Sequence, residues 1–184
     1  MKFIRQSIPD IVLFEPQLHR DNRGYFFESF KKKAFEEFIG MKINFIQENE
    51  SKSEKNVLRG LHYQTSPFAQ SKLVRVLHGK VLDIALDIRR SSPTFGQHVA
   101  VELSEKNKLQ MFIPKGFAHA FVVLSNSAVF SYKVDVEYAP DYERGIAYDD
   151  PNLGIDWIIP KQDLIISSKD SKNQNLSNIQ DLFD

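Results

Sequence analysis

Apolar side chains along this chain recur mostly in short runs that alternate with polar ones. Alternate side chains of an extended strand point to opposite faces, so a period of two indicates strands. Turn residues such as Asp-Asn-Arg-Gly and Ser-Ser-Pro separate the runs, which favours an all-β sandwich or barrel. The pattern predicts strands over residues 11–14, 25–30, 43–47, 57–64, 72–76, 81–88, 97–103, 109–113, 119–123 and 128–136.

Helical periodicity is limited to two places. Residues 31–39 predict a short helix, because three apolar residues fall on one face, Ser29 can cap its start and Gly40 can end it. The polar tail from Ser171 carries apolar residues spaced for one docked helix. We therefore expect short peripheral helices around a β core.

The run over residues 57–64 combines strand alternation with candidate chemistry. Alternation places Leu58, Gly60, His62 and Gln64 on one face and Arg59 on the other. A histidine can act as a general base, a metal ligand or a structural hydrogen-bonding group. This strand alone leaves all three roles open for His62.

Two later strands place a polar group among apolar ones. Lys72 shares a face with two valines, so it either reaches water at the rim or points at a negative group. Tyr132 shares a face with Phe130 and Val134, and its hydroxyl needs a hydrogen-bond partner or a function. Asp83 and Asp87 alternate with core positions, and we expect them to be solvent or lumen residues rather than a catalytic pair.

A polar stretch follows the strand predicted at 43–47. Residues 48–53 contain only Glu, Asn, Ser and Lys, which is typical of a solvated loop. The amides of Gln47 and Asn49 could alternatively contact a ligand. In the earlier turn, Arg23 is either a solvated surface charge or an anion-binding group.

Composition narrows the class of protein. A chain of 184 residues is long enough for one domain with a sizeable core, so we expect a single domain over 1–184. The formal net charge is zero and no apolar run is long enough to span a membrane, which argues against nucleic-acid and membrane partners. The chain has no cysteine, and its start lacks the apolar core of a signal peptide, so a cytoplasmic location is expected.

Several motifs together resemble one family along nearly the whole chain. The Pro114-x-Gly-x-x-His119 segment resembles the second motif of cupins. The full set resembles dTDP-4-dehydrorhamnose 3,5-epimerases; its members are Asp21-x-Arg-Gly-Tyr-Phe-x-Glu28, Gln47-x-Asn49, Leu58-Arg-Gly-Leu-His-Tyr-Gln64, Gln70-x-Lys-Leu-Val-Arg75, Pro114-x-Gly-x-x-His119, Tyr132-Lys133 and Asp150-Pro-x-Leu-Gly-Ile-x-Trp157.

The resemblance implies a fold and a reaction. The fold would be a cupin, a double-stranded β-helix or jelly-roll barrel, that has lost its metal, uses no cofactor and forms a homodimer with exchanged N-terminal strands. The reaction would convert dTDP-4-dehydro-6-deoxy-D-glucose to dTDP-4-dehydro-L-rhamnose in deoxysugar biosynthesis.

The resemblance also implies residue roles. His62 would remove protons at C3 and C5, Tyr132 would return a proton from the opposite face, and Asp170 would orient the imidazole. Lys72 and His119 would stabilise the enolate oxygen. Binding of the sugar nucleotide would fall to Arg23, Glu28, Gln47, Asn49, Arg59, Lys72, His119, Glu143 and Lys169.

Two points in the sequence bear on these roles. Strict alternation puts Arg59 opposite His62, so both reach one site only if the strand bulges at Gly60. The sequence from Trp157 to Pro160 is longer than the usual Trp-Pro of the family, which affects the register of Lys169 and Asp170.

Three other functions compete with this one. A related enzyme could epimerise C3 alone or C5 alone. A metal-dependent cupin would need a second histidine near His62, where the sequence has Gln64. A sugar-binding cupin would need the arginines but neither a base nor an acid.

Overall fold

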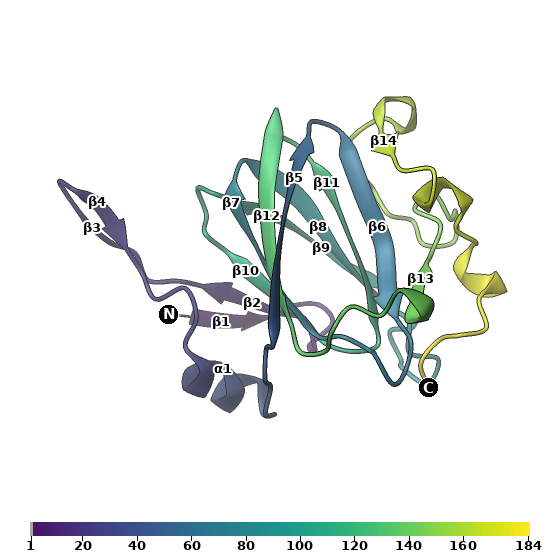
Figure 1. The fold of residues 1–184 in the computed structure, drawn as a ribbon, viewed down its shortest axis with the longest axis horizontal. Helices are drawn as coiled ribbons and strands as arrows, with labels where there is room; N and C mark the ends of the chain where they lie inside the picture. The colour runs from purple at the N-terminus through teal and green to yellow at the C-terminus, as the bar shows by residue number, and fades with distance from the viewer. Residues whose placement is uncertain (1) are drawn as a thin grey trace.

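The computed structural model describes residues 2–184, and its body consists of two β-sheets that face each other (Figure 1). Neighbouring strands are antiparallel, except that β14 runs parallel to β6. One sheet has the order β1 (Lys2–Arg5), β2 (Val12–Glu15), β10 (Gln110–Ile113), β7 (Lys72–His78), β12 (Ser127–Val134) and β5 (Gln47–Glu54). The other has the order β13 (Glu143–Gly145), β6 (Val57–Gln64), β11 (Phe117–Val123), β8 (Lys80–Asp87) and β9 (His98–Ser104), with β14 (Ile165–Ile166) beside β6.

This arrangement confirms the predicted cupin-like jelly roll, although the two sheets remain separate and do not close into a continuous barrel. Strand β8 shows why the sequence folds this way. Its residues Val81 and Ala85 pack between the sheets, while Leu82, Ile84 and Leu86 pack on the outer face. The second sheet is therefore buried on both faces, which explains the nearly continuous apolar run in β8.

The C-terminal segment covers that outer face (Figure 1). The single helix predicted for the tail is wrong. The segment instead forms the short 3₁₀ turns η3 (Asp170–Lys172) and η4 (Leu176–Asn178), following η1 (Pro140–Tyr142) and η2 (Lys161–Asp163). The backbone of this segment forms hydrogen bonds with the body of the protein. For example, the Ala147 N–H donates to the Gln174 carbonyl at 2.8 Å. Those hydrogen bonds, and the burial of Leu176 and Ile179, replace the bonds of a helix.

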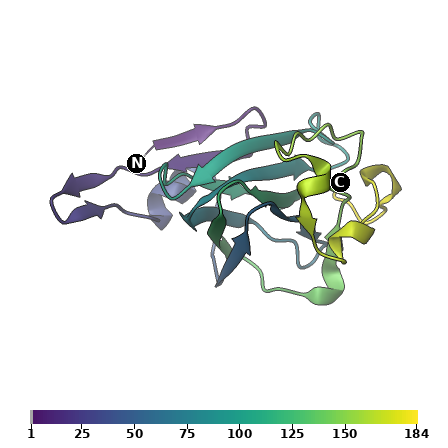
Figure 2. The same cartoon turned by 90° about the horizontal axis from the view of Figure 1, so that it is seen from above.

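The N-terminal part adds a helix and an arm. Helix α1 (Lys32–Ile39) confirms the predicted helix and ends at Gly40 in the left-handed conformation. Ser29 is not its cap, because the N-cap is Lys31, without a side-chain hydrogen bond. The hairpin of β3 (His19–Asp21) and β4 (Gly24–Phe26) projects from the body in both views (Figures 1 and 2). Within residues 2–184, no helix is both long and apolar enough to cross a membrane.

Strand β5 corrects the prediction of a loop over residues 48–53. It pairs with β12 over eight residues, from Gln47 opposite Val134 to Glu54 opposite Ser127. Its charged residues are exposed, whereas the intervening amides and hydroxyls are at least partly buried. The alternation of a strand is therefore present, but between charged and neutral polar residues, so a hydrophobic pattern does not reveal it.

Strand β6 contains the bulge on which the direction of Arg59 depends. His62 pairs with His119 and Arg59 pairs with Phe121. Three residues along β6 therefore span the same length as two residues along β11. Gly60 sits in the bulge with φ +120°, and a Cβ there would lie 2.5 Å from the His119 carbonyl oxygen. The bulge is confirmed, and strict alternation is wrong for this strand.

Candidate active site

A cavity of about 520 Å³ opens between the sheets, a size within the range of small-molecule sites. Strands β6 and β11 supply one wall, β7 and β12 the other, and residues 165–170 cover one side. It contains seven of the predicted site residues, which are Arg59, His62, Lys72, His119, Tyr132, Lys169 and Asp170.

His62 and Asp170 form a histidine–carboxylate pair at this cavity. His62 Nε2 lies 2.6 Å from Asp170 Oδ1, and the Gly60 N–H donates to Asp170 Oδ2 at 3.4 Å. The imidazole is 28% exposed and the carboxylate 4%. With Nε2–H donating to Asp170, Nδ1 is the nitrogen that carries the lone pair. The predicted register of Asp170 therefore holds despite the longer loop before it.

Asp170 is held in its charged form. Burial alone raises the pKa of this carboxyl, but the hydrogen bonds from His62 and Gly60 outweigh it and lower the pKa below the ordinary value. A charged carboxylate beside the imidazole stabilises the proton that a base acquires. The pair is thus suited to general-base catalysis.

Tyr132 reaches the cavity from the opposite sheet. It packs against the apolar cluster between the sheets, and its ring centroid lies 6.2 Å from that of Phe130. Burial raises the pKa of Tyr132, which keeps the hydroxyl protonated. Asn49 is its backbone partner across β5, and Gln47 Nε2 donates to Asn49 Oδ1 at 2.8 Å. The two amides lie beside the cavity and do not line it.

Lys72 contributes a partly buried cation. No group within residues 2–184 forms a hydrogen bond or ion pair with its ammonium. Burial lowers the pKa of Lys72 to about 8, while the charges of Asp83 and Glu143 oppose that change. The structure places Lys72 in the lining of the cavity, where it has no ion-pair partner among the described residues.

His119 bonds to Asp83, and the expectation that Asp83 is a solvent or lumen residue is wrong, because its carboxylate is fully buried. Its Nε2 lies 3.0 Å from Asp83 Oδ1 and 3.1 Å from Oδ2. Asp83 is fully buried behind the cavity wall. The signal was available in the sequence, because an aspartate that alternates with Val81 and Ala85 on a core face needs a buried partner.

Arg59 points into the cavity because of the bulge. Its Nε donates to Ser53 Oγ at 3.0 Å across the space between β6 and β5. This hydroxyl was not identified from sequence, because it lies in the stretch taken for a loop.

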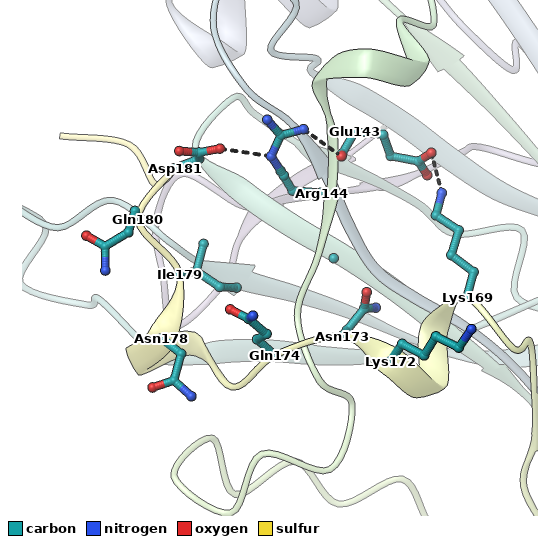
Figure 3. A pocket seen from close by; sticks show the side chains of 11 residues that line it. Glu143, Arg144, Lys169, Lys172, Asn173, Gln174, Asn178, Ile179, Gln180 and Asp181 are labelled. Carbon is teal, nitrogen blue, oxygen red and sulfur yellow. Dashed lines mark hydrogen bonds and ion pairs between the residues drawn. The ribbon is translucent and has the colours of Figure 1, made fainter.

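Glu143 and Lys169 form an ion pair at the rim (Figure 3). The Tyr138 hydroxyl also donates to Glu143, at 2.7 Å. Beyond this pair lies a second, polar hollow of about 430 Å³, in which Arg144 pairs with Asp181 at 2.9 Å. Its lining contains no histidine and no tyrosine.

Two predicted binding residues lie away from the cavity. Arg23 is in the projecting arm, where its side chain is 86% exposed and pairs with Asp21. Glu28 follows the arm and pairs with Lys31 at 3.2 Å. Within one chain, the structure does not bring them to the other site residues.

The same positions bear on metal binding. Within residues 2–184, no group of three or more His, Cys, Asp or Glu side chains is placed to hold a metal ion. His62 and His119 lie side by side on adjacent strands, and each is bonded to its own aspartate.

Comparisons with known proteins agree on one family. The family model described as dTDP-4-dehydrorhamnose 3,5-epimerase matches residues 5–178. The dTDP-4-dehydrorhamnose 3,5-epimerase of Pseudomonas aeruginosa is 53% identical over 175 residues, which is 95% of each chain. The crystal structure of the same enzyme from Elizabethkingia anophelis is 47% identical, with a TM-score of 0.94 over 97% of each chain.

A third relative was crystallised with a ligand. The dTDP-6-deoxy-D-glucose-3,5-epimerase of Legionella pneumophila, in complex with dTDP-4-keto-L-rhamnose, is 49% identical with a TM-score of 0.93. The match covers 97% of this chain and 94% of that one.

Proposed function

The chain belongs to the dTDP-4-dehydrorhamnose 3,5-epimerase family, and on this premise we propose how its cavity carries out the reaction. The enzyme is an isomerase that epimerises C3 and C5 of dTDP-4-dehydro-6-deoxy-D-glucose to give dTDP-4-dehydro-L-rhamnose. Both carbons flank the 4-keto group, so removal of either proton gives an enolate whose oxygen needs stabilising.

His62 is the proposed base. Its Nδ1 takes the proton from C3 or C5 while Nε2–H remains bonded to Asp170. The charged carboxylate stabilises the imidazolium that results. This contact is the observation that carries the proposal, since it fixes both the orientation and the charge of the base.

Tyr132 is the proposed acid. It belongs to the sheet opposite His62, so the two groups approach a sugar between them from opposite faces. Inversion requires that a proton removed from one face be replaced on the other. A tyrosine kept protonated by burial can supply that proton.

Lys72 is the proposed electrophile for the enolate oxygen. Its ammonium has donors without protein partners in the described chain, and a partly buried cation stabilises developing negative charge strongly. His119 lines the same region from β11 and completes the binding of the keto end.

We assign the nucleotide to the rim and to a second copy of the chain. Arg59, Glu143 and Lys169, with the amides of Gln47 and Asn49, lie in or beside the cavity of one chain. Arg23 and Glu28 would reach it from a partner in a homodimer with exchanged arms. The exposed Tyr25 and Phe26 of the arm support this arrangement, because large exposed apolar side chains favour an interface. A cytoplasmic location stays a prediction.

Deuterium incorporation tests the reaction directly. The purified protein is incubated with the 4-keto sugar nucleotide in deuterated water, and the product is examined by NMR. We expect deuterium at both C3 and C5 together with the L-rhamno product. Label at one carbon alone would identify a single-carbon epimerase, and the absence of label at both would leave only a sugar-nucleotide-binding protein.

A further inference from the structure

We propose that Asp83 is a positioning residue for the keto end of the site, where its buried carboxylate orients His119 and compensates the positive charge of Lys72. This inference rests on the proposed function and deepens it. Asp83 does not line the cavity, so it acts through the two side chains that do.

The geometry of Asp83 is that of a fixed counter-ion. Both of its oxygens contact one atom, His119 Nε2, at 3.0 and 3.1 Å, and the carboxylate is fully buried. The Nε2–H bond sets the plane of the imidazole, so that the rest of the ring stays at the cavity wall. Asp83 comes from β8 and His119 from the adjacent β11, which are paired over seven residues, so the contact is built on rigid elements.

The charges around Lys72 single out Asp83. The cavity that Lys72 lines also contains Tyr132 from β12, Arg59 and His62 from β6, and His119 from β11. The covering segment contributes Lys169 and Asp170, and β5 contributes Glu50, which is exposed to solvent. Two carboxylates in this surrounding already have partners, since Asp170 is bonded to His62 and Glu143 is bonded to Lys169. Asp83 is bonded only to an imidazole, and burial lowers the pKa of that imidazole.

Burial raises the pKa of the Asp83 carboxyl, while the contact with His119 and the charge of Lys72 oppose that rise. The carboxylate and the ammonium thus favour each other's charged form. The carboxylate of Asp83 is the strongest of the charges that oppose the loss of the lysine's proton. A neutral lysine could not stabilise an enolate as a cation does. Asp83 therefore sets the upper end of the pH range in which the enzyme works.

Asp83→Asn tests this role, because an amide keeps the shape and can still accept from His119 while removing the charge. We expect the NMR titration of the Lys72 side chain to have its midpoint near pH 8 in the wild type. In Asp83→Asn we expect it at least about one unit lower. The Lys72 signal is assigned by its loss in Lys72→Arg. Equal midpoints in the two proteins would overturn the proposal.

The pH profile of kcat/KM gives a second readout. In Asp83→Asn, the alkaline limb should move down by at least about one unit, so that the loss of activity at pH 8.5 exceeds the loss at pH 6 by about tenfold. In a Lys72→Arg background the same substitution should leave that limb in place, because arginine stays protonated. A limb that moves equally in both backgrounds would assign Asp83 a merely structural role.

The Lys72 titration of the wild type still tests the proposal if Asp83→Asn does not fold. Should Asp83→Asn not fold, a wild-type Lys72 midpoint below pH 7 would contradict the proposal, and a midpoint near 8 would support it. The titration needs no substrate. Absence of turnover by the wild type would therefore refute the proposed function without touching the inference about Asp83.

Discussion

Replacing Gly60 by alanine tests whether the bulge in β6 builds the active site. Gly60 has φ +120°, which L side chains rarely adopt, and a Cβ there would lie 2.5 Å from both Ala120 Cβ and the His119 carbonyl oxygen. Neither obstacle is a flexible side-chain end. The substitution therefore forces β6 away from β11 beside His62.

The cost can be estimated in two parts. The backbone conformation costs about 1–3 kcal/mol for a residue with a Cβ, and the forced overlap costs about 1–3 kcal/mol more. The sum of about 2–6 kcal/mol is a large share of the stability of an ordinary domain. For a chain of 184 residues it corresponds to a fall in Tm of about 5–20 °C.

Gly24→Ala is the matched control for the backbone part. Gly24 has a similar φ of +128°, but its Cβ would have no neighbour within 4 Å. We expect Gly60→Ala to unfold at a lower denaturant concentration than Gly24→Ala. We also expect a fall in kcat/KM of about 10²-fold below the unfolding transition, because a 1 Å shift of a catalytic group has about that effect. Equal stability of the two variants, with full activity in Gly60→Ala, would refute the account of the bulge.

Three further predictions concern the base, the acid and the acid stability of the fold. Asp170→Asn should lower kcat by about 10²–10⁴-fold, as expected when a base loses its orienting carboxylate. Steady-state kinetics with unchanged nucleotide affinity would check this, and a kcat equal to that of the wild type would contradict it. Tyr132→Phe should still exchange substrate protons with deuterated water but form little epimer, and unimpaired product formation would reject its role as the acid. Asp87 accepts hydrogen bonds from Arg89 at 2.7 and 2.9 Å. Burial alone would raise the pKa of Asp87, but these hydrogen bonds hold that pKa at about 2, against 3.8 for a free aspartate. The depressed pKa stabilises the fold above pH 4 by about 2 kcal/mol. That contribution is lost as the pH falls toward 2, so urea unfolding of Asp87→Asn should depend less on pH in this window, and an unchanged dependence would show that the charge does not matter.

The fold was predictable wherever burial follows a simple period. Strand β8 shows this, since its two faces pack in two cores and its apolar residues recur without interruption. The segment that became β5 was missed because its partly buried positions carry Gln, Asn and Ser instead of apolar residues. The structure of the tail was not predicted because its backbone forms hydrogen bonds with the body of the protein. Local periodicity does not encode such tertiary contacts.

The candidate site was predictable mainly through motifs. His62, Lys72 and Tyr132 were located by residue type and strand face, and the structure brings them to one cavity. Asp170 comes 108 residues after His62, so only the resemblance could suggest their contact. Asp83 was undervalued because its importance depends on the register between β8 and β11, which places it beside His119.

The role of His62 as the base is the central claim, and deuterium exchange by His62→Ala tests it most directly. The variant is first shown to bind the sugar nucleotide with nearly wild-type affinity, and it is then incubated with the substrate in deuterated water. We predict no enzyme-dependent exchange at C3 or C5. Substantial exchange at either carbon would contradict the account and place the base elsewhere in the cavity.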